Sequence, residues 1–226
     1  DSDAGENLIL FNTPAGTRTF EGTMTGVSMH STIIDASKVR ELYNDGKELD
    51  VTTFSGFNLV QGYWRNNGLS TWTDLSTNSN DGTVNNITET LLIPSGVDGS
   101  RDSQGFIMNR QRNTSSLNLT NGTDDYVDVP VTTAGGTADD DLAFIGEDDG
   151  FSISFWVKLH RALSGTEYLI NRNDTEDGWR LGLDSDEKIF FQVEKNNTVK
   201  GAITDSGISL NTWYHVVGTT DGGDGD

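Results

Sequence analysis

The clearest pattern in the chain is a strict alternation of apolar and polar residues over positions 151–159. The apolar positions are Phe151, Ile153, Phe155, Val157 and Leu159. Two serines, Trp156 and Lys158 stand between them. A period of two predicts a β-strand with one wholly apolar face toward a core and a wetter opposite face.

Further short strands are predicted on both sides of this one, because apolar runs alternate with Gly- and Asx-rich turn signals. This spacing is typical of an antiparallel sandwich or jelly roll. The sequence therefore predicts an all-β, antiparallel two-sheet β-sandwich. The expected strands cover residues 7–11, 17–21, 23–30, 59–65, 105–110, 116–119, 126–131, 167–171, 179–183, 188–194, 198–203 and 212–219.

The strand over residues 23–30 also has predicted faces. Simple alternation places the side chains of residues 24, 26, 28 and 30 on one face and those of residues 25, 27 and 29 on the other. Met24 and Met29 would then point to opposite sides of the sheet.

One short helix is predicted over residues 35–44. Asp35 suits the N-cap, Ile34 can pack on Val39 as a hydrophobic staple, and Gly46 stands where a helix would stop. Residues 45–58 are mostly polar and are expected to form a linker. The stretch 66–86 is rich in Asx and Gly residues and is interrupted by Trp72 and Leu75.

Composition narrows the classes of partner. The 226 residues suit one all-β domain, and the formal net charge is −20. So negative a surface disfavours binding to nucleic acid and to anionic lipid. It could attract cations, but a solvated acidic surface is the favoured explanation of the charge. No apolar run is long enough to predict membrane insertion. The chain has no cysteine, which excludes disulfides and thiolate chemistry. Its first residue is Asp, so we expect a processed product or part of a longer polypeptide.

Three segments resemble the concanavalin A-like, laminin-G-like jelly-roll family. The first is the Asx-rich turn of residues 74–84, and the second is Asp125-Tyr126-Val127-Asp128-Val129 followed by the strand over 151–159. The third is the Trp-Tyr-His-Val-Val-Gly-Thr run of residues 213–219. They occur in family order across residues 59–226, so the resemblance implies a concanavalin A-like jelly roll.

The N-terminal segment is similar to the end of such a domain. Residues 20–30 and the helix that ends Leu42-Tyr43-Asn44 resemble its closing strands. One interpretation is a single permuted laminin-G-like sandwich over 1–226, with closing elements in 1–48 and opening and central strands in 59–226. Residues 7–11 would then pair beside 213–218 of the same chain. The alternative is that the chain holds parts of two tandem modules.

The sequence predicts no enzymatic activity. Related glycoside hydrolases need two poised carboxylates, usually in a Glu-x-Asp-x-x-Glu strand, and no such string occurs. The nearest is Glu147-Asp148-Asp149, in an acidic stretch that we expect to be a solvated loop. His30, His160 and His215 lack metal-ligand spacing, and Ser28 with His30 is interpreted as a polar pair on a strand.

Calcium is the candidate cofactor, because it takes oxygen ligands from flexible loops. The candidate ligands are Asp74, Asn78, Asn80 and Asp81, and a network of Asx-turns without metal is the alternative. In the related calcium sites an acid of the closing strand completes the set, whereas this chain has Thr25-Gly26 there. A second possible place is the Asp-rich end, residues 221–226, together with Asp1 and Asp3.

Sugar binding would need exposed aromatic rings beside polar groups. The aromatic candidates are Trp64, Trp72, Trp156 and Trp179, of which Trp64, Trp72 and Trp179 are the predicted ligand-binding residues. Core packing is the competing explanation for each of them. Trp72 is the best candidate because its segment is rich in turns.

We therefore expect a structural or interaction module that acts by contact. Residues 59–84, which begin Leu59-Val60-Gln61-Gly62-Tyr63-Trp64-Arg65, resemble modules of phage structural proteins. That resemblance implies a virion surface or appendage, or an extracellular location, with other structural subunits in a homo- or hetero-oligomeric assembly as partners. The alternative function is a lectin-like module for cell-surface or extracellular glycans.

Overall fold

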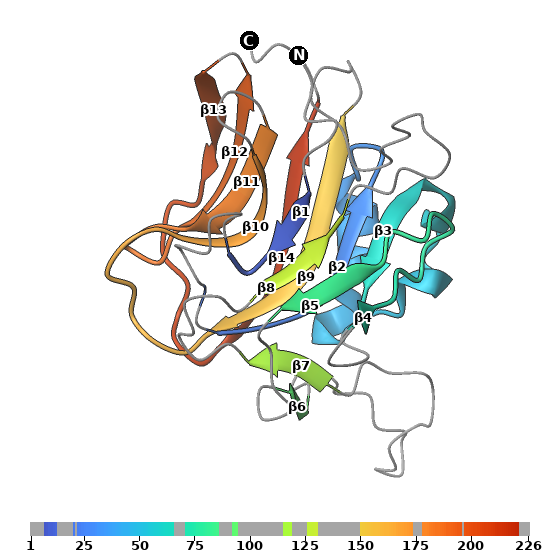
Figure 1. The fold of residues 1–226 in the computed structure, drawn as a ribbon, viewed down its shortest axis with the longest axis horizontal. Helices are drawn as coiled ribbons and strands as arrows, with labels where there is room; N and C mark the ends of the chain where they lie inside the picture. The colour runs from blue at the N-terminus through green and yellow to red at the C-terminus, as the bar shows by residue number, and fades with distance from the viewer. Residues whose placement is uncertain are drawn as a thin grey trace.

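The protein is a two-sheet antiparallel β-sandwich in the computed structural model (Figure 1). This confirms the predicted fold class. The predicted strand over 105–110, most of that over 17–21, and the acidic stretch with Glu147–Asp149 lie outside the described residues. The structure describes residues 7–12, 20, 22–65, 71–85, 92–94, 115–118, 126–130, 150–173, 178–195 and 197–221.

The larger sheet has eight strands, and one of its central strands, β1, comes from the start of the chain. Strand β1 lies between β10 and β8, and pairs antiparallel with both. Strands β13 and β4 are the two edges. In spatial order the strands are β13 (Thr198–Ile203), β12 (Ile189–Lys195), β11 (Gly178–Leu183), β10 (Glu167–Asn173), β1 (Leu8–Leu10), β8 (Tyr126–Val129), β5 (Gly82–Asn85) and β4 (Thr71–Trp72).

The smaller sheet has six strands and is also centred on an early segment. Strand β2 pairs with β9 along most of its length, and with β3 and β7 on its other side. Strand β14 pairs with β9 and forms one edge. The members are β14 (Trp213–Thr220), β9 (Phe151–Leu159), β2 (Gly22–His30), β7 (Ser115–Asn118), β6 (Leu92–Pro94) and β3 (Val60–Trp64).

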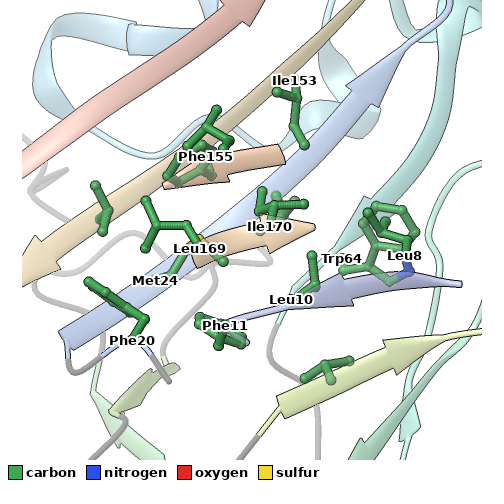
Figure 2. Packing of buried hydrophobic residues seen from close by; sticks show 14 of the residues in the cluster. Leu8, Leu10, Phe11, Phe20, Met24, Trp64, Ile153, Phe155, Leu169 and Ile170 are labelled. Atoms are coloured by element: carbon green, nitrogen blue, oxygen red, sulfur yellow. The ribbon is translucent and has the colours of Figure 1, made fainter. Parts of the chain in front are cut away.

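The core lies between the two sheets and contains the predicted apolar row. All five alternating side chains of β9, from Phe151 to Leu159, are fully buried, as predicted. Across from them lie Leu8 and Leu10 of β1 and Ile170 of β10 (Figure 2). The start of the chain therefore supplies apolar side chains to the interior from the middle of both sheets.

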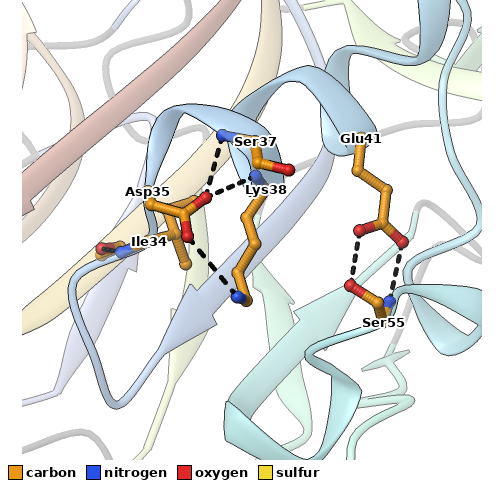
Figure 3. Close-up of polar contacts among 7 residues, drawn as sticks. Ile34, Asp35, Ser37, Lys38, Glu41 and Ser55 are labelled. Atoms are coloured by element: carbon orange, nitrogen blue, oxygen red, sulfur yellow. Dashed lines mark hydrogen bonds and ion pairs between the residues drawn. The ribbon is translucent and has the colours of Figure 1, made fainter.

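A helical layer covers part of the outer face of the six-stranded sheet. It consists of helix α1 (Ala36–Tyr43) and three 3-10 turns, η1 (Asn44–Gly46), η2 (Val51–Thr53) and η3 (Phe57–Leu59). The predicted N-cap is confirmed, because Asp35 accepts hydrogen bonds from the backbone N–H groups of Ser37 and Lys38 at 2.8 and 2.9 Å (Figure 3). None of the helices in the described part of the chain is long and apolar enough to span a bilayer.

Residues 45–58 are not the polar linker that the sequence predicted. Val51 and Phe54 are buried with Ile34, Leu42 and Tyr63 in a second hydrophobic cluster, between the helical layer and the sheet. A paired contact also ties α1 to this segment, since Glu41 accepts hydrogen bonds from both the N–H and the hydroxyl of Ser55 (Figure 3). The few apolar residues among polar ones are enough to fix the layer.

The predicted faces of β2 are wrong after residue 25. The register with β9 shifts between Thr25 and Ser28, and Gly26 there has a φ of 61°. Such a bulge inserts one extra residue and reverses the alternation that follows. Met24 and Met29 therefore both face the core, whereas Ser28 lies on the outer face.

The predicted neighbour of residues 7–11 is also wrong. Strand β1 pairs with β8 and β10 in the eight-stranded sheet, whereas β14 pairs with β9 in the other sheet. It is β2, not β1, that lies next to β9. Whether the chain is one permuted domain or parts of two tandem modules stays a prediction.

Candidate binding surface

All three histidines of the chain lie on the outer side of the six-stranded sheet, and each is hydrogen-bonded to a hydroxyl. Strand pairing places these distant positions on the same face of the sheet, although their spacing along the chain does not indicate it. The nitrogen-to-oxygen distances are 3.1 Å for His30 and Ser28, 2.8 Å for His215 and Ser154, and 2.6 Å for His160 and Thr23.

Two of these pairs form one row across the sheet. Ser154 of β9 lies directly opposite Ser28 of β2, so the row runs from His215 on β14 to His30. Ser28, His30 and Ser154 are buried, because the helical layer covers this part of the sheet. The opposite face of β9 is thus not wetter, as the sequence suggested, but forms a second buried layer.

Among the described residues, the Ser28–His30 pair lacks the third group of an activated nucleophile. Such a site needs a third group that orients the base. Within the described part of the chain, the Nδ1 atom of His30 has no hydrogen-bond partner. Both side chains are also buried away from solvent. The arrangement is a buried polar pair within one strand, β2.

Beside the helical layer lies an aromatic patch formed by Tyr43, Trp156, Lys158, Trp213 and His215. The ring of Tyr43, at the end of α1, stacks on Trp156 with centroids 5.8 Å apart. Trp156 in turn lies 5.1 Å from His215. The ammonium group of Lys158 lies 5.1 Å from the centre of the Trp213 ring, in a cation–π contact.

The most exposed member of this patch is Tyr43, and Lys158, Trp213 and His215 are half-buried. The Tyr43 side chain is 46% exposed, whereas Trp156 beneath it is buried. Tyr43 therefore presents an aromatic ring to solvent, packed on Trp156 and next to the imidazole of His215. Flat amphipathic ligands bind to rings in such surroundings.

The three predicted sugar-binding tryptophans are instead in the core. Trp64, Trp72 and Trp179 are all buried in the main hydrophobic cluster. Trp64 donates its indole N–H to the carbonyl of Asn80 at 2.7 Å. Trp72 packs edge-on against Phe11, with centroids 5.9 Å apart. Contrary to expectation, Trp72 is not exposed, because it lies in strand β4 of the eight-stranded sheet and its ring packs into the core.

The four predicted calcium ligands do come together, in one hydrogen-bonded turn centred on Asp74. The Asp74 carboxylate accepts bonds from the N–H groups of Tyr63, Ser76 and Asn80 and from the Ser76 hydroxyl, at 2.7–2.9 Å. Asp81 accepts a bond from the Asp74 N–H at 2.8 Å. Every one of these acceptors is matched to a protein donor, which is how an Asx-turn network is built.

The two asparagines of this turn bind the neighbouring strand. Both Asn78 and Asn80 donate their amide N–H groups to the carbonyl of Gln61, at 3.0 and 3.1 Å. Among the residues that the structure describes, no group of three or more His, Cys, Asp or Glu side chains is placed to hold a metal ion. Of the second predicted place, only Asp221 lies within the described residues.

Fold and surface together define an antiparallel β-sandwich in which Ser28, His30 and Ser154 of the outer face are buried under the helical layer. The comparison with protein families agrees with this fold. A laminin-G-type family model of the concanavalin A-like lectin/glucanases superfamily matches residues 121–226, slightly less than half of the chain. Two of the three resembling segments lie in this range, and the resemblance is confirmed there.

One curated relative is similar over a short stretch. Botulinum neurotoxin type X of Clostridium botulinum is 32% identical over 69 residues, which cover 29% of this chain and 5% of the neurotoxin. The chain thus spans only a small fraction of that protein's length. No solved structure matches the chain significantly.

The buried histidines predict a pH-dependent stability. Burial lowers the pKa of His30 and of His215 from 6.5 to about 4. The folded state therefore favours the neutral imidazole, and this stabilisation is complete above pH 6.5 and is lost as the pH falls toward 4. For His30 the loss should be on the order of 2–3 kcal/mol.

Urea unfolding of the wild type and of His30→Gln, measured at pH 7, 5.5 and 4.5, checks this. The variant should be less stable at pH 7 but should lose less stability on acidification. Equal losses in both proteins would show that His30 does not titrate between its folded and unfolded states in this way.

Proposed function

We propose that the chain is a non-enzymatic binding module that works by surface contact within a larger structural assembly, on a virion surface or appendage. The observation that carries the proposal is the burial of its reactive side chains. The Ser28–His30 row lies under the helical layer, and the Asp74 carboxylate is occupied by backbone and hydroxyl donors. Contact surfaces, rather than a reactive centre, are then what the fold offers to other molecules.

The family match supports this proposal at the level of a binding or lectin-like module. The virion setting is supported by the likeness of residues 59–84 to phage structural modules. In the structure these residues form β3 (Val60–Trp64), β4 (Thr71–Trp72) and the Asp74 turn, which pack on the sandwich. Nothing of the neurotoxin's activity is carried over, because the match covers 5% of its length.

Particle fractionation tests the virion setting. Extracellular particles from cells that carry the gene should be purified by density gradient and probed with antibody to this chain. The chain should co-sediment with intact particles and be accessible to the antibody without disruption. Recovery only as free protein, with particles devoid of it, would contradict the setting while leaving the binding-module class in place.

Carbohydrate recognition is the second candidate function, and the exposed ring of Tyr43 favours it. An aromatic ring beside His215 can stack on the apolar face of a sugar while polar neighbours bind its hydroxyls. This moves the candidate site from Trp64, Trp72 and Trp179 to the aromatic patch. Cell-surface or extracellular glycans would be the ligands.

A glycan array followed by titration tests this candidate. For any glycan that binds, Tyr43→Ala should weaken affinity at least tenfold, which corresponds to about 1.4 kcal/mol. Leu210→Ala is the matched control, because Leu210 is similarly exposed, at 43%, and lies outside the patch. An array without hits, or binding that Tyr43→Ala leaves intact, would oppose carbohydrate recognition at this patch.

Calcium at the Asp74 turn also stays a proposal. Side-chain and backbone oxygens of Asp74, Asn78, Asn80 and Asp81 gather in one place, although an ion would have to displace protein donors from Asp74. If calcium binds the folded state, millimolar calcium should raise the midpoint of thermal unfolding above that in millimolar magnesium. An unchanged midpoint would argue against a specific site.

A further inference from the structure

Among the described strands, β13 is an edge of the eight-stranded sheet and lacks the features that usually protect a sheet edge. It is the outermost strand of the eight-stranded sheet, pairs only with β12 among the described strands, and all six of its residues are exposed. Its register with β12 is unbroken from Phe190↔Ile203 to Lys195↔Thr198. Natural edges are commonly blunted by proline, bulges or charges. This strand has no proline and no bulge, and its one charge is Lys200.

The free hydrogen-bonding groups of this edge can be assigned from the ladder. The Thr204 N–H donates to the Ile189 carbonyl at 2.9 Å, so this pair is hydrogen-bonded. Hydrogen-bonded and non-hydrogen-bonded pairs alternate in an antiparallel ladder. The backbone groups of residues 198, 200 and 202 therefore face β12. Those of Val199, Gly201 and Ile203 face outward.

The side chains at the same three positions share one face of the sheet. Their partners on β12 are Glu194, Gln192 and Phe190, whereas Phe191 and Val193 pack toward the core. Val199 is 42% exposed and Ile203 is 55% exposed. The strand thus has one exposed apolar side chain on each side of Gly201, namely Val199 and Ile203. These are the same residues whose backbone groups face outward.

We infer that β13 pairs antiparallel with β13 of a second copy of this chain, across a two-fold axis at Gly201. In this register Val199 lies opposite Ile203 of the second copy, Gly201 opposite Gly201, and Ile203 opposite Val199. All three pairs use outward backbone groups, so each exchanges two hydrogen bonds. The exposed apolar side chains meet one another, which is the self-complementary pattern that a two-fold interface requires.

Glycine at the axis makes the close approach feasible. The residue on the two-fold axis lies directly opposite the same residue of the second copy. Because Gly201 has no side chain, no two side chains meet at the axis. A Cβ atom at this position would already lie 2.2 Å from the Phe191 carbonyl oxygen of the same chain. The glycine is thus required by β12, and its absence of a side chain also leaves the axis clear for a second copy.

Charge sets the conditions under which the pair forms. Two chains that each carry a net charge of −20 repel one another, and salt screens this repulsion. Association should therefore strengthen as ionic strength is raised from about 0.01 to 0.5 M. The inference goes beyond the proposed function and does not depend on the virion setting.

Sedimentation velocity over a range of micromolar to submillimolar concentrations tests the interface on the 226-residue chain. The wild type should form a dimer, and Ile203→Lys should weaken it at least tenfold. Val199→Pro should do the same, because it removes an outward N–H without removing a bond to β12. Leu210→Lys, at an exposed apolar side chain outside β13, is the control and should leave the dimer unchanged.

Amide hydrogen exchange supplies a readout independent of folding defects in the variants. In the wild type, the amides of Val199, Gly201 and Ile203 should become protected as protein concentration rises. The amides of residues 198, 200 and 202 should be protected at all concentrations. A chain that stays monomeric at 0.5 M salt would overturn the inference, even if its β13 pairs with added extended peptides. A dimer in which the amides of Val199, Gly201 and Ile203 exchange at a rate independent of protein concentration would also overturn it.

Discussion

The packing of two apolar rows against each other, one from each sheet, is the interaction on which the rest of the structure depends. Burial of such side chains is the main favourable term in folding. The first strands of the chain complete both rows. Strand β1 brings Leu8 and Leu10 to the middle of one sheet, and β2 brings Met24, Val27 and Met29 to the middle of the other. The sandwich thus closes through contacts between segments more than a hundred residues apart (Figure 2).

The helical layer gives the outer face of the six-stranded sheet a different character from that of the eight-stranded sheet. It buries Ser28, Ser152, Ser154 and His30, which a bare sheet would expose. The Ile34 N–H donates a hydrogen bond to the Ser152 hydroxyl. Among the described residues, the exposed ring of Tyr43 at the end of α1 and the edge strand β13 are two features that can contact other molecules.

The sequence predicted the features that depend only on residues close together along the chain. The β9 row follows from its alternation, and the N-cap of α1 follows from Asp35. The faces of β2 were missed because one residue of bulge at Gly26 reverses the parity of everything after it. The place of β1 was missed because a strand of three residues carries no information about its partners.

Contacts made at long range were the hardest to foresee. Trp72 lies in a stretch that looks like loop, yet its ring fills the core beside Phe11. Val51 and Phe54 are isolated among polar residues, and only the three-dimensional layer shows that they pack together. The convergence of three histidines on one side of a sheet depends on strand order and register. Neither quantity can be obtained from spacing along one chain.

The most direct test of this dependence is removal of the first strands. A chain that lacks residues 1–31 loses β1 and β2 and so leaves both sheets split at their centres. Thermal unfolding followed by circular dichroism and calorimetry should then show no cooperative transition, in contrast to the full chain. A truncated chain that unfolds cooperatively near the midpoint of the full chain would contradict the central role of those strands.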